Sequence, residues 1–186
     1  IKCTFHYPNH NLMKKNYFIH VLFLLFTLPI FSQENIVKIA AIGSDGDIIG
    51  IQYERSLTDR ISILGTIGYA SFSYMYFTTT GFGLNAEGRY YFTKNKDLME
   101  GWHAGAYLDY KNTEGEGEYY AGDIYINTFG IGLIGGYQFV FSPSITLDLF
   151  AGGGLEFDDS DLGGSLEGRE DTEFVIPLGI SLGYNF

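Results

Sequence analysis

Apolar and polar positions alternate one by one along much of this chain, and the pattern is clearest at its end, in EFVIPLGISLGYNF. Large apolar side chains occupy every second position from Phe174 to Phe186, and mostly small residues, such as Gly179 and Ser181, lie between them. A period of two is the period of a β-strand, whose successive side chains point to opposite faces. This segment is therefore predicted to be a strand with one wholly apolar face.

Seven further segments show the same period. They are Ile36 to Ile42, Ile48 to Ser56, Ile61 to Tyr74, Gly81 to Phe92, Trp102 to Tyr110, Ile124 to Phe141 and Ile145 to Phe157. No stretch of useful length after residue 32 has the 3.6-residue period of a helix, and glycine, which disfavours helix, falls inside many segments. The sequence thus predicts an all-β fold with eight strands.

The links between these segments alternate in kind. LTDR, TKNKDLMEG and SPS are short or basic, whereas KNTEGEGEYYAGD and DDSDLGGSLEGREDT are longer, rich in glycine and acidic. GSDGD and MYFTTT, which fall on the same side as the long links, are shorter. Longer links on one side and short ones on the other are typical of an up-and-down barrel.

The two faces of the predicted strands differ in a consistent way. Phe82, Leu84 and Phe92 share one face of the fourth segment, whereas Glu87 and Arg89 lie on the other. A lipid-facing exterior and a polar interior explain this pattern, because only a closed barrel leaves no unpaired strand edge in a bilayer. The prediction is an eight-stranded antiparallel up-and-down transmembrane β-barrel. A soluble ligand-binding barrel of lipocalin type would need the reverse pattern.

Aromatic residues gather at the strand ends beside the short links. Such a girdle is typical of side chains at a membrane interface. Its predicted members are Phe92, Trp102, Phe139, Phe141, Tyr184 and Phe186.

The N-terminal region has the layout of a secretory signal peptide. Lys14 and Lys15 precede an apolar run that ends at Phe31, and the small residue Ser32 stands before Gln33. The alternative, a retained membrane helix, would need a longer run. We expect residues 1–12 to be upstream translation or a cloning scar, residues 13–32 to be a signal peptide for Sec export, cleaved near Ser32/Gln33, and residues 33–186 to form the barrel in the bacterial outer membrane.

Removal of the signal leaves a single histidine, His103, and no cysteine. This composition excludes disulfides and Cys/His metal sites, and no cofactor is expected. The remaining 8 basic and 22 acidic side chains give a net charge of −14, which makes nucleic acid an unsuitable partner. The glycine-rich phrases GGGLEF and GIGLIGG lie in predicted strands with no following helix, so they are not phosphate-binding loops.

The C-terminal Phe186, with Tyr184 two positions before it, resembles the assembly signal of bacterial outer-membrane barrels. The phrases GIQYERSLTDRISILGTIGY, GFGLNAEGRYYF and GWHAGAYLDY resemble a family of small Gram-negative outer-membrane barrels of OmpA/OmpX-like type. The resemblance covers nearly all of residues 33–186 and departs from the usual signal at Ser181, where glycine is commoner. It implies the fold, the location and insertion by the barrel-assembly machinery, but no activity.

Several predicted strands carry charge at inward positions. An eight-stranded barrel is just wide enough for its own side chains, and unpaired buried charges are costly, so opposite charges are expected to meet. The sequence predicts a charge network that plugs the lumen, formed by Lys38, Glu54, Glu87, Arg89, Asp109 and Asp148. The alternative is a narrow pore or a proton-conducting path.

A lipid-modifying enzyme would need His103 as its base. His103 falls at the first inward position of its strand, beside the short links, whereas lipid-modifying sites usually lie toward the outer rim. The role expected for His103 is structural.

The acidic links are expected to form a negatively charged outer rim. Around Asp158, Asp159 and Asp161 we expect weak, diffuse binding of divalent cations, which would bridge the rim to anionic lipopolysaccharide, because the spacing matches no EF-hand. The resulting interpretation is a monomeric structural or surface-interaction barrel whose partners are outer-membrane lipids and lipopolysaccharide. A lipid-modifying enzyme and a narrow pore for small solutes remain the alternatives.

Overall fold

The computed structural model describes residues 35–43, 47–74, 77–93, 99–117, 123–142, 144–162 and 169–186. The described residues form nine strands, which are β1 (Asn35–Gly43), β2 (Asp47–Ser56), β3 (Ile61–Tyr74), β4 (Phe77–Tyr91), β5 (Gly101–Gly117), β6 (Asp123–Ser142), β7 (Ile145–Leu162), β8 (Arg169–Val175) and β9 (Leu178–Asn185). No helix in this part of the chain is long and apolar enough to cross a membrane. The predicted signal peptide and its cleavage site lie outside the described residues.

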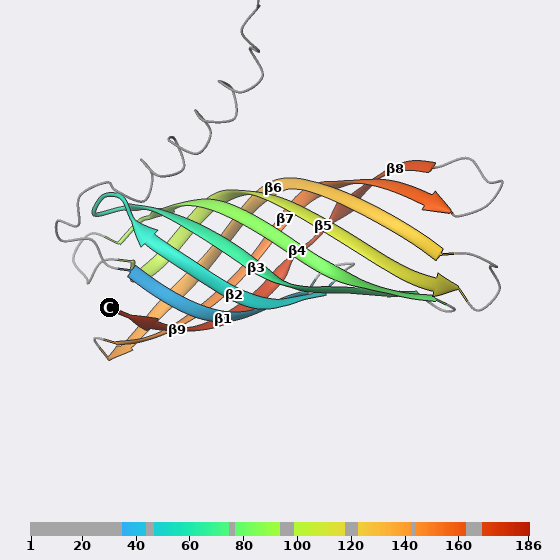
Figure 1. Ribbon diagram of the computed structural model, residues 1–186. Coiled ribbons are helices and arrows are strands. Elements are labelled where there is room, and N and C mark those ends of the chain that lie inside the picture. The colour runs from blue at the N-terminus through green and yellow to red at the C-terminus, as the bar shows by residue number, and fades with distance from the viewer. Residues whose placement is uncertain are drawn as a thin grey trace, which may run out of the picture. The chain divides into compact units, whose positions relative to one another are not determined.

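The strands pair antiparallel in chain order, and β1 pairs with β9, so the sheet closes on itself (Figure 1). β8 and β9 both pair with β7 and together form the eighth strand of the wall. The interruption falls at Ile176 and Pro177, where proline has no N–H to donate to the ladder. The Pro177 carbonyl still accepts a hydrogen bond from the Gly152 N–H at 2.8 Å. The predicted eight-stranded antiparallel barrel is therefore confirmed.

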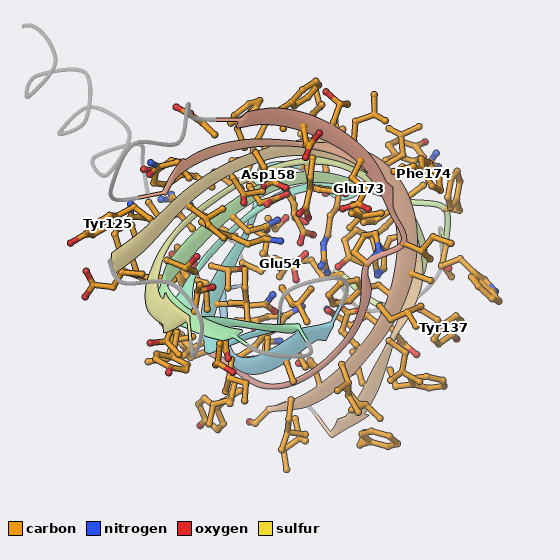
Figure 2. The ribbon with its side chains drawn as sticks, turned by 90° about the vertical axis from the view of Figure 1, so that its right-hand side faces the viewer. Glu54, Tyr125, Tyr137, Asp158, Glu173 and Phe174 are labelled. Carbon is orange, nitrogen blue, oxygen red and sulfur yellow. The ribbon has the colours of Figure 1, made fainter. Side chains whose placement is uncertain are left out.

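Side chains alternate between the outside of the wall and the lumen, as predicted. On β9, Ile180 and Leu182 are 50% and 58% exposed, whereas Ser181 between them is 1% exposed. In the view along the barrel, Phe174 and Tyr137 point outward and Glu54 points into the lumen (Figure 2). This is the reverse of a soluble barrel of lipocalin type, because the charges are inside and the large apolar side chains are outside.

Aromatic side chains line the outside near the short links. Trp102 stands edge-on to Tyr137 with ring centroids 5.2 Å apart, and Tyr137 lies 4.5 Å from Phe139. Each predicted girdle residue is exposed, from 38% for Phe139 to 66% for Phe141. These rings form a continuous outer surface across neighbouring strands.

On the opposite side of the barrel, the predicted extent of the links is wrong, because strand pairing continues through much of them. β5 runs to Gly117, β7 runs to Leu162, and β4 already begins at Phe77. Glycine and acidic residues disfavour strands locally, but pairing with a neighbouring strand overrides that preference. Glu114, for example, stands in register between Thr80 of β4 and Tyr125 of β6.

Candidate functional site

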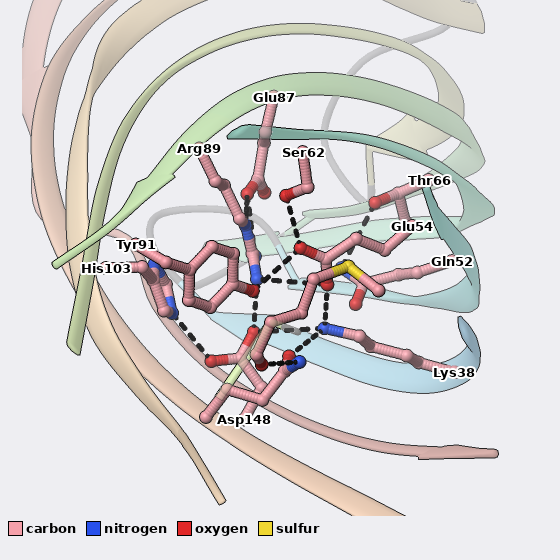
Figure 3. Close-up of polar contacts among 12 residues, drawn as sticks. Lys38, Gln52, Glu54, Ser62, Thr66, Glu87, Arg89, Tyr91, His103 and Asp148 are labelled. Carbon is pink, nitrogen blue, oxygen red and sulfur yellow. Dashed lines mark hydrogen bonds and ion pairs between the residues drawn. The ribbon is translucent and has the colours of Figure 1, made fainter. Parts of the chain in front are cut away.

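Buried polar side chains meet in the lumen near the short links (Figure 3). Seven successive strands, β1 to β7, each supply at least one of them, and we call the group the lumen network. Every member is 5% exposed or less. The members are Lys38, Glu54, Ser62, Glu87, Arg89, Tyr91, His103, Gln138 and Asp148.

Glu54 on β2 is fully buried and has both carboxylate oxygens engaged. Its Oε2 lies 2.5 Å from the Lys38 Nζ. Its Oε1 accepts hydrogen bonds from the Ser62 hydroxyl at 2.6 Å and the Tyr91 hydroxyl at 2.7 Å. Buried carboxylates are tolerated when they are paired and hydrogen-bonded in this way.

Arg89 on β4 connects three carboxylates. Its Nε and Nη2 are each 2.7 Å from Glu87 Oε2, and its Nη1 is 2.5 Å from Asp148 Oδ2. The same Nη1 lies 3.7 Å from Glu54 Oε2. The guanidinium carbon also lies 5.6 Å from the centre of the Phe150 ring, a cation–π distance.

Asp148 on β7 closes the network from the other side of the lumen. Its Oδ1 is 2.9 Å from the His103 Nε2, and its Oδ2 is 3.4 Å from the Lys38 Nζ. The Lys38 Nζ also donates a hydrogen bond to Gln138 Oε1 at 2.5 Å. Side chains from β1, β5, β6 and β7 are therefore joined at one level of the barrel.

The charges of the lumen network nearly balance. Lys38 and Arg89 face three carboxylates, and His103 stands next to one of these. Several hydrogen bonds per group offset the cost of removing the charges from water, which is the condition under which buried ion pairs persist. The arrangement holds the strands together and obstructs the lumen at this level.

Met99, in the link before β5, covers the network from the end of the barrel. It is 3% exposed, packs in one cluster with Ile36 and Tyr91, and has a positive φ of 62°. Its carbonyl accepts a hydrogen bond from the Gln138 side-chain amide at 2.5 Å. This link was predicted only as a short or basic connection, because its two apolar residues, Leu98 and Met99, are adjacent and have no periodic pattern.

Five of the six residues predicted to form the charge network lie together, namely Lys38, Glu54, Glu87, Arg89 and Asp148. The sixth, Asp109, lies apart from them on β5. Within the described part of the chain, no ion pair or hydrogen bond joins it to the lumen network. Its neighbour on the same face, Lys111, is paired with Glu156 at 2.8 Å.

Sequence reasoning missed the neutral members of the network. Tyr91 lies two residues after Arg89, so strand alternation places it on the same face. Ser62 and Gln138 are inward by the same rule, but neutral side chains were not singled out as candidates for an ionic network.

The predicted cation-binding rim is only partly described. The Thr128 hydroxyl donates a hydrogen bond to Asp158, and Asp159 is exposed on the outer face. The side chain of Asp161 lies outside the described set. In the segments that the structure describes, no three His, Cys, Asp or Glu side chains cluster as metal ligands. Diffuse cation binding at this rim stays a prediction.

The residues of the predicted assembly signal lie on the outer face of β9 and just after it. Tyr184 and Phe186 are 59% and 65% exposed. The Phe186 N–H donates to the Asn35 carbonyl at 2.9 Å, and the Asn35 N–H donates to the Phe186 carbonyl at 3.3 Å. The chain end is therefore fastened to the start of β1, while its role in assembly stays a prediction.

Residues 18–186 match the model of a family described as "Protein of unknown function (DUF3575)". The chain belongs to the DUF3575 family. No curated protein matches this DUF3575 chain.

Solved structures that resemble this DUF3575 chain are β-barrels with low sequence identity. The N-terminal β-barrel domain of Pseudomonas aeruginosa OprF is 18% identical, with 82% of this chain and 97% of that chain covered and a TM-score of 0.49. The attachment invasion locus protein Ail of Yersinia pestis, solved with the heparin analogue sucrose octasulfate, is 13% identical, with 84% and 100% covered and a TM-score of 0.49. Neisserial surface protein A is 15% identical, with 82% and 94% covered and a TM-score of 0.47. At these values the similarities carry no argument about function, and the fold rests on the strand pairing above.

His103 has the surroundings of a structural residue in this DUF3575 chain. Its side chain is 2% exposed, it contacts Asp148, and its ring lies 5.3 Å from the Tyr91 ring. A lipid substrate outside the wall has no access to a side chain buried in this way. The geometry gives no support to His103 as the base of a lipid-modifying enzyme.

Proposed function

We propose that this chain is a structural or surface-interaction protein of the bacterial outer membrane, with a lumen plugged by its own side chains. The proposal rests on one observation. Polar and apolar side chains are distributed in the reverse of the way found in soluble proteins. Large apolar side chains such as Ile39, at 70% exposed, surround the outside, whereas Glu54 and Asp148 are fully buried inside.

The apolar exterior is the surface that a bilayer rewards. In water, a continuous exposed apolar surface of this size would favour aggregation. In lipid, the closed ring of strands leaves no unpaired edge at the level where β1 meets β9, and the apolar side chains contact acyl chains. The aromatic rings beside the short links then lie at the membrane interface.

The lumen network favours a plug over a pore. Arg89, Glu54 and Asp148 fill the centre of the barrel with direct ionic contacts and are all 1% exposed or less. A solute or ion would have to break several charge-assisted hydrogen bonds to pass this level. A narrow pore is the second candidate, and conductance measurements distinguish the two.

The partners proposed for this role are the outer-membrane lipids, lipopolysaccharide at the acidic rim and, during insertion, the barrel-assembly machinery. The protein acts as a monomer in this account, because its whole outer surface is suited to lipid. Divalent cations would connect exposed rim carboxylates such as Asp159 with the anionic groups of lipopolysaccharide.

Three measurements test the proposal. The protein should fractionate with the outer membrane and change its gel mobility on heating, as a closed barrel does. In planar bilayers it should give no steady conductance. Recovery in the soluble periplasmic fraction without detergent would contradict the membrane role, and a stable single-channel conductance would favour the pore.

A further inference from the structure

A second polar region lies in the lumen beyond the lumen network, around a cavity of about 30 Å³, measured as the space open to the centre of a water molecule. Asn85, Glu87, Tyr107, Asp109, Lys111 and Glu156 line its polar side. Apolar side chains, among them Ile134 and Phe150, line the remainder. A space of this size exceeds the 10–15 Å³ or so that one water molecule needs.

Three oxygen atoms on the wall of this cavity are buried and have no hydrogen-bond partner among the residues that the structure describes. They are Asn85 Oδ1, the Tyr107 hydroxyl and Asp109 Oδ2. Tyr107 and Asp109 are only 5% and 6% exposed. Buried polar atoms are almost always satisfied, so three such oxygens around one cavity mark a place suited to water or to a ligand that accepts oxygen donors.

The strand register explains how these oxygens come together. Asn85 stands opposite Asp109, Asp109 stands opposite Gly130, and Gly130 stands opposite Glu156, in one row across four strands. A Cβ atom at Gly130 would lie 2.2 Å from Asp109 Oδ1. Glycine at this position therefore leaves the room that the Asp109 carboxylate occupies.

Tyr107 lies in the next row and depends on glycine in the same way. It stands opposite Gly132, which stands opposite Gly154, and a Cβ atom at Gly154 would lie 2.2 Å from the Tyr107 hydroxyl. The glycines of GIGLIGG and GGGLEF thus let two polar side chains lie flat across the lumen wall toward the cavity.

The carboxylates around the cavity differ in whether they make an ion pair. Glu87 is bonded to Arg89, and Glu156 is bonded to Lys111. Asp109 has no direct cationic partner in the described part of the chain, although it is almost fully buried. Burying an unpaired carboxylate is costly, so a positive charge in the cavity would be stabilising.

We propose that this cavity binds one small hard cation, with the Asp109 carboxylate as its charged ligand. Asn85 Oδ1 and the Tyr107 hydroxyl supply neutral oxygens, and water completes the shell. Carboxylate, amide and water oxygens are the ligands that hard cations prefer, and a site with one carboxylate that makes no ion pair suits a monovalent ion such as Na⁺. The site is independent of the proposed role of the barrel in the membrane.

The test uses the full-length protein purified from membranes in detergent, with a chelator present to remove divalent ions. The temperature at which half of the protein loses its folded gel mobility is measured in increasing NaCl and, at equal ionic strength, in N-methylglucamine chloride, whose cation is too large for the cavity. A ligand that binds only the folded state stabilises it by RT ln(1 + [L]/Kd), so the stabilisation grows with the logarithm of ligand concentration once this exceeds Kd. NaCl should raise the midpoint by a few degrees, increasingly at higher concentration, and the large cation should not.

Matched variants locate the effect. Asp109→Asn should abolish the difference between the two salts, and Asp159→Asn, on the exposed rim, should preserve it. If Asp109→Asn does not fold, Tyr107→Phe and Asn85→Ala should each raise several-fold the NaCl concentration that produces a given rise of the midpoint. Equal midpoints in the two salts for the unaltered protein, or an unchanged salt difference in all of the cavity variants, would overturn the proposal.

Discussion

At the scale of single residues, Arg89 lies next to all three carboxylates of the lumen network. Its guanidinium is bonded to Glu87 and Asp148 and lies near Glu54. Arg89→Met would leave three buried carboxylates with Lys38 as their one fixed cation. We expect the free energy of unfolding, measured by urea titration in lipid vesicles, to fall by about 3–5 kcal/mol, the usual cost of breaking a buried ion pair from one side.

A double variant distinguishes the loss of an ionic contact from the cost of leaving a buried charge without a partner. Replacing Arg89 with Met and Glu87 with Gln should recover part of the loss, because one uncompensated carboxylate is removed. Arg60→Met is the matched control, since Arg60 contacts the Tyr90 hydroxyl on the outside and its loss should cost under about 1 kcal/mol. Additive effects of the two lumen substitutions would contradict a coupled network.

Strand alternation was sufficient to predict which charged residues face inward, but not which of them meet. Glu87 and Arg89 are adjacent on one face of one strand, so their pairing could be expected from sequence alone. Asp148 and Asp109 are equally inward, yet only Asp148 reaches Arg89. The difference depends on the stagger of the closed barrel, which decides the height of each residue in the lumen and has no local sequence signal.

At the scale of elements, glycine permits close packing between β2 and β3. Gly50 and Gly68 stand opposite one another, and a Cβ atom at Gly68 would lie 2.5 Å from the Ile49 carbonyl oxygen. Gly68→Ala should therefore lower the free energy of unfolding by about 1–3 kcal/mol, as overpacking usually does. Gly65→Ala on the same strand has open space around it and should be neutral or slightly stabilising. Equal effects at both positions would contradict this packing.

Arginine substitutions on β9, which pairs with β1, test how deeply each position of this strand lies in the bilayer. Ile180→Arg, near the middle of the outward face of β9, should cost about 2–4 kcal/mol, whereas Tyr184→Arg near the chain end should cost about 0–1 kcal/mol. Both costs are measured by reversible unfolding from lipid vesicles. If arginine were tolerated better in place of Ile180 than in place of Tyr184, the bilayer centre would lie elsewhere on this strand.

The sequence predicted the number and faces of the strands but not all of their ends. The alternation in Phe174 to Phe186 continues through Pro177, so one strand was expected where β8 and β9 are separate segments. Pro177 has no backbone N–H to pair with the neighbouring strand. Its absence interrupts the strand without changing which side chains face outward. Conversely, the acidic and glycine-rich residues before Gly117 look like a loop in isolation, and only their pairing with β4 and β6 makes them strand.

At the scale of the whole molecule, the fold follows from the two faces of one closed sheet. The apolar face is continuous around the barrel, so each strand segment of the sequence indicates the same arrangement, with apolar residues outside and polar residues inside. A few errors in the predicted strand ends therefore do not change the predicted fold. The candidate cation cavity is the opposite case. It depends on Asn85, Asp109 and Glu156 from three different strands, whose common level could not be predicted without the register.

The central claim, that the outer face of this barrel contacts lipid, can be tested with Trp102, the only tryptophan in the chain. Trp102 points outward beside the short links and is 64% exposed. Its fluorescence should be measured for the protein folded in vesicles that contain lipids brominated along the acyl chain, and separately with acrylamide in the water. Lipid contact predicts strong quenching by brominated lipid, strongest for bromine near the headgroups, and weak quenching by acrylamide. Strong quenching by acrylamide with no effect of brominated lipid would contradict it.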